Sequence, residues 1–191
     1  MSTRAVAMAH SFVGFATCAC LLLFHAVGDP FGTINDLGNA LFGLLSLALA
    51  WLLRPASVGP RDATSRLARV LVGVAAVGAV ITVVGTVLVV TDTTGFYLAG
   101  LWSSFGFGLI GVWLVGISRQ TAPGLRRAGL VAGVVMLLGL VGVPGIFMGI
   151  DDMDTAPVWT FVAGASWAGT YLLFPAWSLR LARQDRPEGV G

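Results

Sequence analysis

The stretch VLVGVAAVGAVITVVGTVLVVT, residues 70–91, decides the fold of this chain. It contains no charged residue, and Arg69 and Asp92 bracket it with opposite charges. Its length matches the roughly 20 residues that an α-helix needs to cross the hydrocarbon core of a bilayer. The stretch therefore predicts a transmembrane helix.

The rest of the chain consists of similar charge-free runs. Of the 191 residues, 57% are hydrophobic and only 10% are charged, whereas soluble domains carry roughly 25% charged residues. This composition excludes a water-soluble globular protein, and the low charge also excludes a disordered or nucleic-acid-binding chain. We expect an all-α integral membrane protein, with one transmembrane domain over residues 1–191. Its six helices are predicted at about 5–28, 36–54, 70–91, 95–118, 127–150 and 157–181.

The first charge-free run has an alternative interpretation. Met1 to Arg4 form a basic start before an apolar stretch, which is also how a secretory signal peptide begins. The run is long enough to span a bilayer, however, and no small-residue cleavage pattern ends it. We therefore expect this segment to remain as the first helix of the bundle.

Charges are distributed unevenly between alternate connections. All eleven basic residues are arginines, and they lie in the N-terminal segment, in 54–69, in 119–127 and in the C-terminal tail. The other connections hold six of the nine acids: Asp29, Asp36, Asp92, Asp151, Asp152 and Asp154. Arginine-rich loops stay on the cytoplasmic side, where they meet anionic lipid. We expect a multi-pass protein of a cell membrane, such as the bacterial inner membrane, with both termini in the cytoplasm.

A glycine and a tryptophan thirteen positions apart recur in three predicted helices. The pairs are Gly38 and Trp51, Gly100 and Trp113, and Gly164 and Trp177. This spacing fits three repeated helical hairpins related by an axis along the membrane normal. The alternative is that each tryptophan anchors a helix end at the lipid headgroups, with an arginine shortly after it.

Small residues four positions apart predict close contacts between helices. These sets are Gly129 with Gly133, Gly145 with Gly149, Gly100 with Ser104 and Gly108, and Gly164 with Ala168. Without a Cβ or with only a short side chain, such positions let two helix backbones approach closely. We expect one tight bundle.

Two prolines fall inside predicted helices. Pro144, followed by Gly145, would break the fifth helix near its outer end. Pro175 removes the backbone hydrogen bond to the carbonyl of Tyr171 in the sixth. Carbonyls freed at membrane depth need other partners, so Pro144, Gly145 and Pro175 are candidate hinge residues. The alternative is a structural kink with no ligand.

His25 is the foremost candidate for a functional side chain. It precedes Asp29 by four residues and lies near the predicted cluster of Asn35, Asp36 and Asn39. A histidine beside carboxylates at a membrane surface could couple protons to a conformational change. The alternative is an interfacial histidine paired with a loop acid.

His10 is the only other histidine of the chain. The fifteen residues between the two histidines correspond to about 22 Å along a helix, so one heme cannot use both. We expect no cofactor. The carboxylates of Asp92, Asp151, Asp152 and Asp154 are candidate binding groups, but the spacing of a calcium loop is missing. We therefore expect a solvated acidic turn and no metal site.

Catalytic patterns are absent from the sequence, and the chain has no lysine for Schiff-base chemistry. We predict a small transporter or channel-like protein without catalytic residues. One alternative is an accessory subunit of a membrane complex, either with a partner subunit or as a homo-oligomer. A second is a membrane enzyme or cofactor protein that acts on an apolar substrate. Membrane lipids are the expected partners, and nucleic acid is not.

Overall fold

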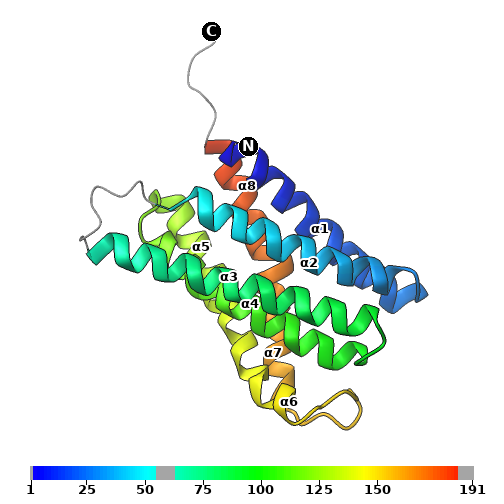
Figure 1. Cartoon of the computed structure of the whole chain (residues 1–191). Helices are drawn as coiled ribbons and strands as arrows, with labels where there is room; N and C mark the ends of the chain where they lie inside the picture. The colour runs from blue at the N-terminus through cyan, green and yellow to red at the C-terminus, as the bar shows by residue number, and fades with distance from the viewer. Residues whose placement is uncertain (1, 55–62, 185–191) are drawn as a thin grey trace.

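Five long apolar helices form the frame of the molecule (Figure 1). The computed structural model describes residues 2–54 and 63–184, which contain helices and no strand. The helices begin with α1 (Thr3–Val27), α2 (Phe31–Leu52), α3 (Ala63–Val90) and α4 (Phe96–Ser118). Then α5 (Pro123–Leu137) continues through a 3₁₀ segment, η1 (Leu138–Gly142), into α6 (Val143–Phe147). Each of these five units is long and apolar enough to cross a membrane.

The sixth predicted helix is less regular. It consists of α7 (Thr160–Ala168), a π-helical segment η2 (Gly169–Leu173) and α8 (Phe174–Gln184). In η2 the helix widens, and the amide of Phe174 donates to the carbonyl of Gly169, five residues back. This wide turn comes directly before Pro175, which has no amide hydrogen to give. The segment is also less apolar than the other five. It is not among the described helices that are long and apolar enough to cross a membrane.

Three helices begin well ahead of the starts that the charges predict. α2 begins at Phe31, α3 at Ala63 and α5 at Pro123, ahead of the predicted starts at 36, 70 and 127. Asp36 does not mark the end of a helix at the headgroups, because it lies inside α2 and is buried against neighbouring helices. A formal charge is thus a poor marker of a helix end where other helices cover it. Arg61 and Arg186, on which the orientation argument also draws, lie outside the described residues.

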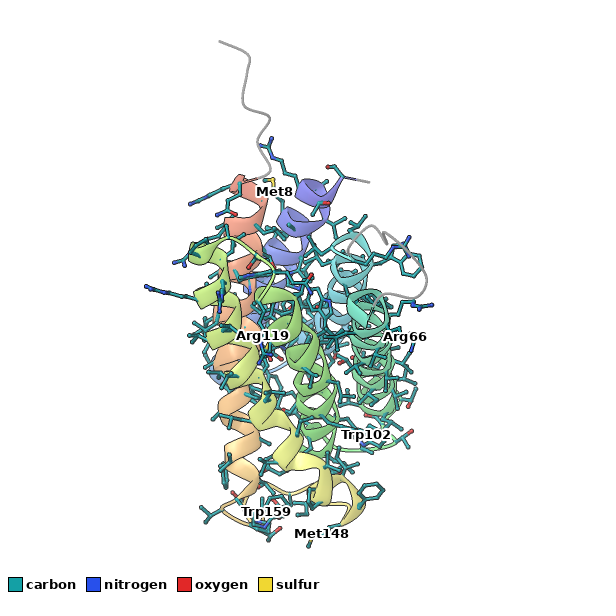
Figure 2. The ribbon with its side chains drawn as sticks, turned by 90° about the vertical axis from the view of Figure 1, so that its left-hand side faces the viewer. Met8, Arg66, Trp102, Arg119, Met148 and Trp159 are labelled. Carbon is teal, nitrogen blue, oxygen red and sulfur yellow. The ribbon has the colours of Figure 1, made fainter. Side chains whose placement is uncertain are left out.

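The helices close into a ring, in which α4 is the most buried of the five long helices. Neighbours in sequence pack in antiparallel pairs from α1 to α5, and α8 returns to pack against α1 (Figure 1). The start of α1 and the end of α8 therefore lie at the same end of the bundle, opposite Met148 and Trp159 (Figure 2). We call the end with connections 28–30, 91–95 and 148–159 the acidic end, and the other the basic end.

The core of the bundle is dominated by aromatic side chains. Trp113 and Trp177 are 1% and 0% exposed and meet edge to face, with ring centroids 6.3 Å apart. Their burial is inconsistent with the interpretation that they anchor helix ends at the headgroups. Only Trp51 fits that interpretation, since it is 56% exposed and the Arg54 guanidinium lies 3.6 Å from its ring centroid. The three glycine–tryptophan pairs therefore have different environments.

Candidate functional site

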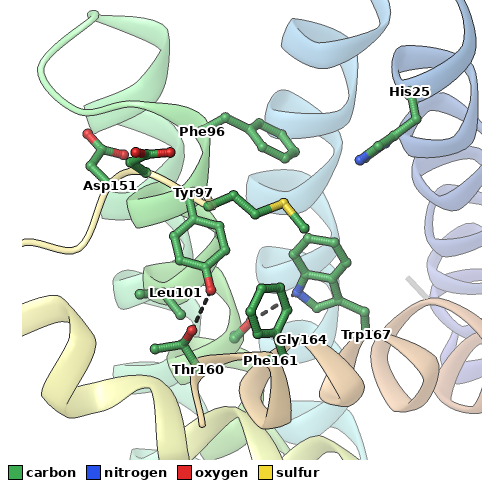
Figure 3. A pocket seen from close by; sticks show the side chains of 13 residues that line it. His25, Phe96, Tyr97, Leu101, Asp151, Thr160, Phe161, Gly164 and Trp167 are labelled. Carbon is green, nitrogen blue, oxygen red and sulfur yellow. Dashed lines mark hydrogen bonds between the residues drawn. The ribbon is translucent and has the colours of Figure 1, made fainter. Parts of the chain in front are cut away.

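A cavity of about 370 Å³ opens between α1, α4, α7 and the 148–159 connection, at the acidic end (Figure 3). We call it the outer cavity. It is lined by His25, Phe96, Tyr97, Gly100, Leu101, Ser104, Asp151, Asp152, Met153, Thr160, Phe161, Gly164 and Trp167. Most of this surface is apolar, and a few polar groups point toward it.

Small residues on α4 and α7 leave the space for this cavity. A Cβ added to Gly164 would meet nothing within 4 Å, and one added to Gly100 would touch only Trp167, at 3.4 Å. At Gly133, by contrast, the predicted small-residue contact is filled, because an added Cβ would lie 2.7 Å from a methyl of Val115. The spacing that predicts close packing therefore makes a tight contact at Gly133 and a hollow at Gly164.

Two hydrogen bonds between α4 and α7 hold aromatic rings at the cavity wall (Figure 3). The hydroxyls of Tyr97 and Thr160 lie 2.6 Å apart. Thr160 gives its own hydrogen to the carbonyl of Pro157, at 2.7 Å, so Tyr97 is the donor to Thr160. The indole N–H of Trp167 donates to Ser104 Oγ over 2.9 Å, which leaves the Ser104 hydroxyl hydrogen available.

His25 presents one free ring nitrogen to the outer cavity. Its Nδ1 lies 2.9 Å from the carbonyl of Leu21, and a carbonyl only accepts, so Nδ1 carries a hydrogen. In the neutral ring, Nε2 then has a free lone pair, and Figure 3 shows the ring directed toward the cavity and Trp167. The predicted pairing with Asp29 is not formed, because α1 ends at Val27 and the exposed Asp29 lies beyond its cap.

A small second cavity lies next to the outer cavity, among buried polar side chains. Its volume is about 10 Å³, close to the space that one water molecule needs. We call it the inner polar pocket, and it is lined by Leu21, Asn35, Asp36, Asn39, Phe96, Gly100, Ser103, Trp167 and Tyr171. Phe96, Gly100 and Trp167 line both cavities.

A chain of hydrogen bonds orders the amides of the inner polar pocket. The Tyr171 hydroxyl donates to Asn39 Oδ1 over 2.8 Å, and Asn39 Nδ2 donates to Asn35 Oδ1 over 3.3 Å. Asn35 Nδ2 donates to the carbonyl of Thr17 over 3.0 Å. These bonds join three helical units, α1, α2 and η2. They also fix which atoms of Asn35 and Asn39 face the pocket.

Asp36 and Ser103 also line this pocket but take no part in the chain of hydrogen bonds, and of the two only Asp36 is ionisable. It is 9% exposed, and within residues 2–54 and 63–184 its carboxylate makes no hydrogen bond or ion pair. Its backbone carbonyl accepts from the Thr86 hydroxyl at 2.8 Å. A buried carboxylate normally needs a partner, and an ionisable group inside the membrane is usually functional. Asp36 is therefore the residue of this pocket most available to a ligand.

The acids of the 148–159 connection mainly organise the backbone. Asp151 accepts from the amides of Gly95, at 2.6 Å, and Leu98, at 3.1 Å, which caps the start of α4. Asp152 accepts from the amide of Asp154 at 3.0 Å. This capping role was not predicted from sequence, because the partners lie more than fifty residues apart.

The remaining candidates lie outside both cavities. Asp92 is exposed in the turn between α3 and α4, with φ +53°, and Asp154 is exposed in its connection. Pro144 lies in the first turn of α6, directly after η1, and Pro175 lies in α8 directly after η2. Each proline thus follows a non-α segment, and a hinge at either place stays a prediction.

His10 was not predicted to have a structural role, yet it is completely buried and joins three helices. Its Nε2 lies 3.0 Å from Ser46 Oγ on α2, and its Nδ1 lies 2.7 Å from Ser178 Oγ on α8. Its ring packs against those of Phe42 and Phe174, with both centroids at 4.3 Å. Since both ring nitrogens have partners, neither is left to bind a heme iron.

Comparison of the chain with protein-family models, with curated proteins and with solved structures finds no match. In the described parts of the chain, no three His, Cys, Asp or Glu side chains come together as a possible metal site. We therefore infer a function from the outer cavity, the inner polar pocket and the side chains around them.

Proposed function

We propose that this chain is a small transporter that receives a small amphipathic molecule in the outer cavity. The observation that supports this is the position of the cavity, which opens at one end of an apolar bundle and adjoins buried polar side chains. Its volume, its aromatic lining and its few polar groups are typical of ligand sites, which span roughly 300–1,000 Å³.

We further propose six membrane crossings with both termini in the cytoplasm. The five long apolar helices and the segment Thr160–Gln184 provide six crossings, and an even number agrees with two termini at one end of the bundle. The arginine excess favours the basic end as the cytoplasmic one. The outer cavity then opens away from the cytoplasm, with lipids as the surroundings of the bundle.

The irregular helical segments favour a transporter over a rigid accessory subunit. η1 packs against α7, and η2 packs against α5, so the two non-α segments lie in neighbouring helical units. Segments with 3₁₀ or π bonding often mark functional bends. Bending at η1 and η2 would move α6 and α7 relative to α4 and so change the walls of the outer cavity.

Uptake into proteoliposomes tests this proposal. The probes are 2-phenylethyltrimethylammonium and 3-phenylpropanoate. The first carries a permanent positive charge, and the second is almost fully ionised at neutral pH. We expect the wild-type protein to carry at least one of them. Gly164→Leu should abolish that uptake, because the new side chain enters the outer cavity without touching another group within 4 Å of its Cβ.

Gly73→Leu is the matched control, since Gly73 is also helical and open but lies on α3, away from both cavities. It should transport like the wild type. No uptake of either probe by correctly inserted wild-type protein, or equal uptake by Gly164→Leu, would contradict the proposal.

A further inference from the structure

We infer that the outer cavity and the inner polar pocket form one binding site for an organic cation, with its apolar body among the aromatic rings and its ammonium group at Asp36. This inference rests on the proposed function and names the substrate class of the same site. It goes further because it assigns separate parts of the ligand to the two cavities.

The first step is that the two cavities are neighbours with a shared wall. Phe96, Gly100 and Trp167 line both, and Gly100 contributes no side chain to the boundary. Trp167 is held by Ser104, whereas Phe96 is half-buried and packs against the Phe24 ring, at a centroid distance of 5.0 Å. A rotation of the Phe96 side chain is therefore the movement that would join the cavities.

The second step is the charge of the joined site. No arginine lines either cavity. Asp151 and Asp152 face the outer cavity, but both already accept hydrogen bonds from backbone amides. Asp36 is left as the carboxylate without a partner, and burial strengthens its attraction for a cation while it repels an anion.

The third step is the shape and chemistry of the outer cavity. Phe96, Tyr97, Phe161 and Trp167 surround it with aromatic faces and edges (Figure 3). Such rings accept an apolar body and attract a cation through their negative faces. The free Nε2 of His25 adds an acceptor for a ligand N–H at the cavity wall. An ammonium ion with an aromatic or aliphatic body matches the rings and Asp36, and His25, which lines only the outer cavity, would meet a second N–H carried by that body.

Binding to the purified full-length chain in detergent tests the inference. The probes are 2-phenylethylammonium, 2-phenylethanol and 3-phenylpropanoate, which share a phenyl body and differ in charge. By titration calorimetry, we expect the ammonium to bind at least tenfold more tightly than the alcohol, and the carboxylate not to bind measurably. Asp36→Asn should reduce the ammonium affinity to that of the alcohol and leave alcohol binding unchanged.

Asp92→Asn is the control, because it removes a carboxylate from the acidic end that lines neither cavity. It should keep the wild-type preference. The three wild-type titrations test the charge preference even if Asp36→Asn fails to fold. Equal binding of ammonium and alcohol, or unchanged ammonium binding by a folded Asp36→Asn, would overturn the inference.

Binding of sodium chloride without any organic probe, lost in Asp36→Asn and accompanied by no ammonium binding, would assign Asp36 to an inorganic cation and would also overturn the inference. Failure of the inference and of the proposed function are distinguishable. Uptake of 3-phenylpropanoate without ammonium binding would leave transport in place and remove cation recognition. Ammonium binding without uptake would leave cation recognition in place and remove transport.

Discussion

The two histidines of α1 show how differently the two ends of this bundle are built. His10, toward the basic end, is fully buried and has partners for both ring nitrogens. His25, at the acidic end, uses one nitrogen within its own helix and faces a cavity with the other. The same side chain thus holds helices together in one half and remains available to a ligand in the other.

The difference extends to the packing around each histidine. Near His10, the rings of Phe42, Phe174 and Trp177 are all 0% exposed. Near His25, the outer cavity leaves space at Gly164 that no side chain fills. We therefore expect substitutions around His10 to cost more stability than substitutions around the outer cavity.

Among the variants that test this difference between the two ends, His10→Ala should have the largest effect on stability. The substitution leaves a hole beside the rings of Phe42 and Phe174 and removes a partner from Ser46 and from Ser178. We expect the free energy of unfolding to fall by about 2–4 kcal/mol, measured by thermal or denaturant unfolding in detergent. His25→Ala is the matched control and should change it by less than about 1 kcal/mol. Equal effects of the two variants would remove the distinction between the two ends.

Gly133→Ile tests whether the contact between α5 and α4 is as tight as the structure indicates. A Cβ at Gly133 meets Val115 at 2.7 Å and the carbonyl of Gly111 at 2.9 Å. Because backbone atoms cannot move aside easily, we expect a loss of about 1–3 kcal/mol, read from the melting temperature. Gly124→Ile on the same helix, where a Cβ meets nothing within 4 Å, should melt close to the wild type. Wild-type stability of Gly133→Ile would count against the contact.

Asp151→Asn should have a smaller effect, confined to the acidic end. The variant keeps the shape of the side chain but loses the negative charge at the start of α4, where Gly95 and Leu98 donate to it. We expect a loss of about 0.5–1 kcal/mol in the free energy of unfolding. Asp154→Asn, exposed in the same connection, provides the control and should be neutral. A neutral Asp151→Asn would show that the cap adds nothing measurable.

Trp51→Phe should have the smallest effect, and it separates exposed from buried tryptophans. Trp51 is 56% exposed, and its interaction with Arg54 is worth about 0.5–1 kcal/mol at most. We expect its melting temperature to fall by a small fraction of the fall in Trp177→Phe, because Trp177 is 0% exposed. Comparable losses in the two variants would indicate that Trp51 is buried by a partner subunit or a second copy of the chain.

The sequence was sufficient to predict the five long apolar helices, because length and the absence of charge follow directly from the thickness of a bilayer. The prediction was wrong at the start of α2, because a charged residue marks the end of a transmembrane helix only when no other helix covers it. Asp36 is covered, and the residues that line its pocket come from α1, α4, α7 and η2 as well as from α2, which no local pattern reveals.

The sites depend on contacts that lie far apart in the sequence. Tyr171 bonds Asn39 across 132 positions, and Ser178 bonds His10 across 168. Sequence spacing could single out His25 and Asp36 as polar groups in apolar surroundings. It could not show that His25 faces a cavity, that Asp36 lies in a small pocket beside that cavity, or that His10 is fully bonded.

The cap formed by Asp151 ties the entrance of the outer cavity to the first turn of α4. The residue that seals the amides of Gly95 and Leu98 belongs to the connection that forms the rim. If this connection moves away to admit a large ligand, both hydrogen bonds to Asp151 break. Both amides then become free to exchange with deuterium. Deuterium uptake at Gly95 and Leu98 therefore measures how often the entrance of the outer cavity opens.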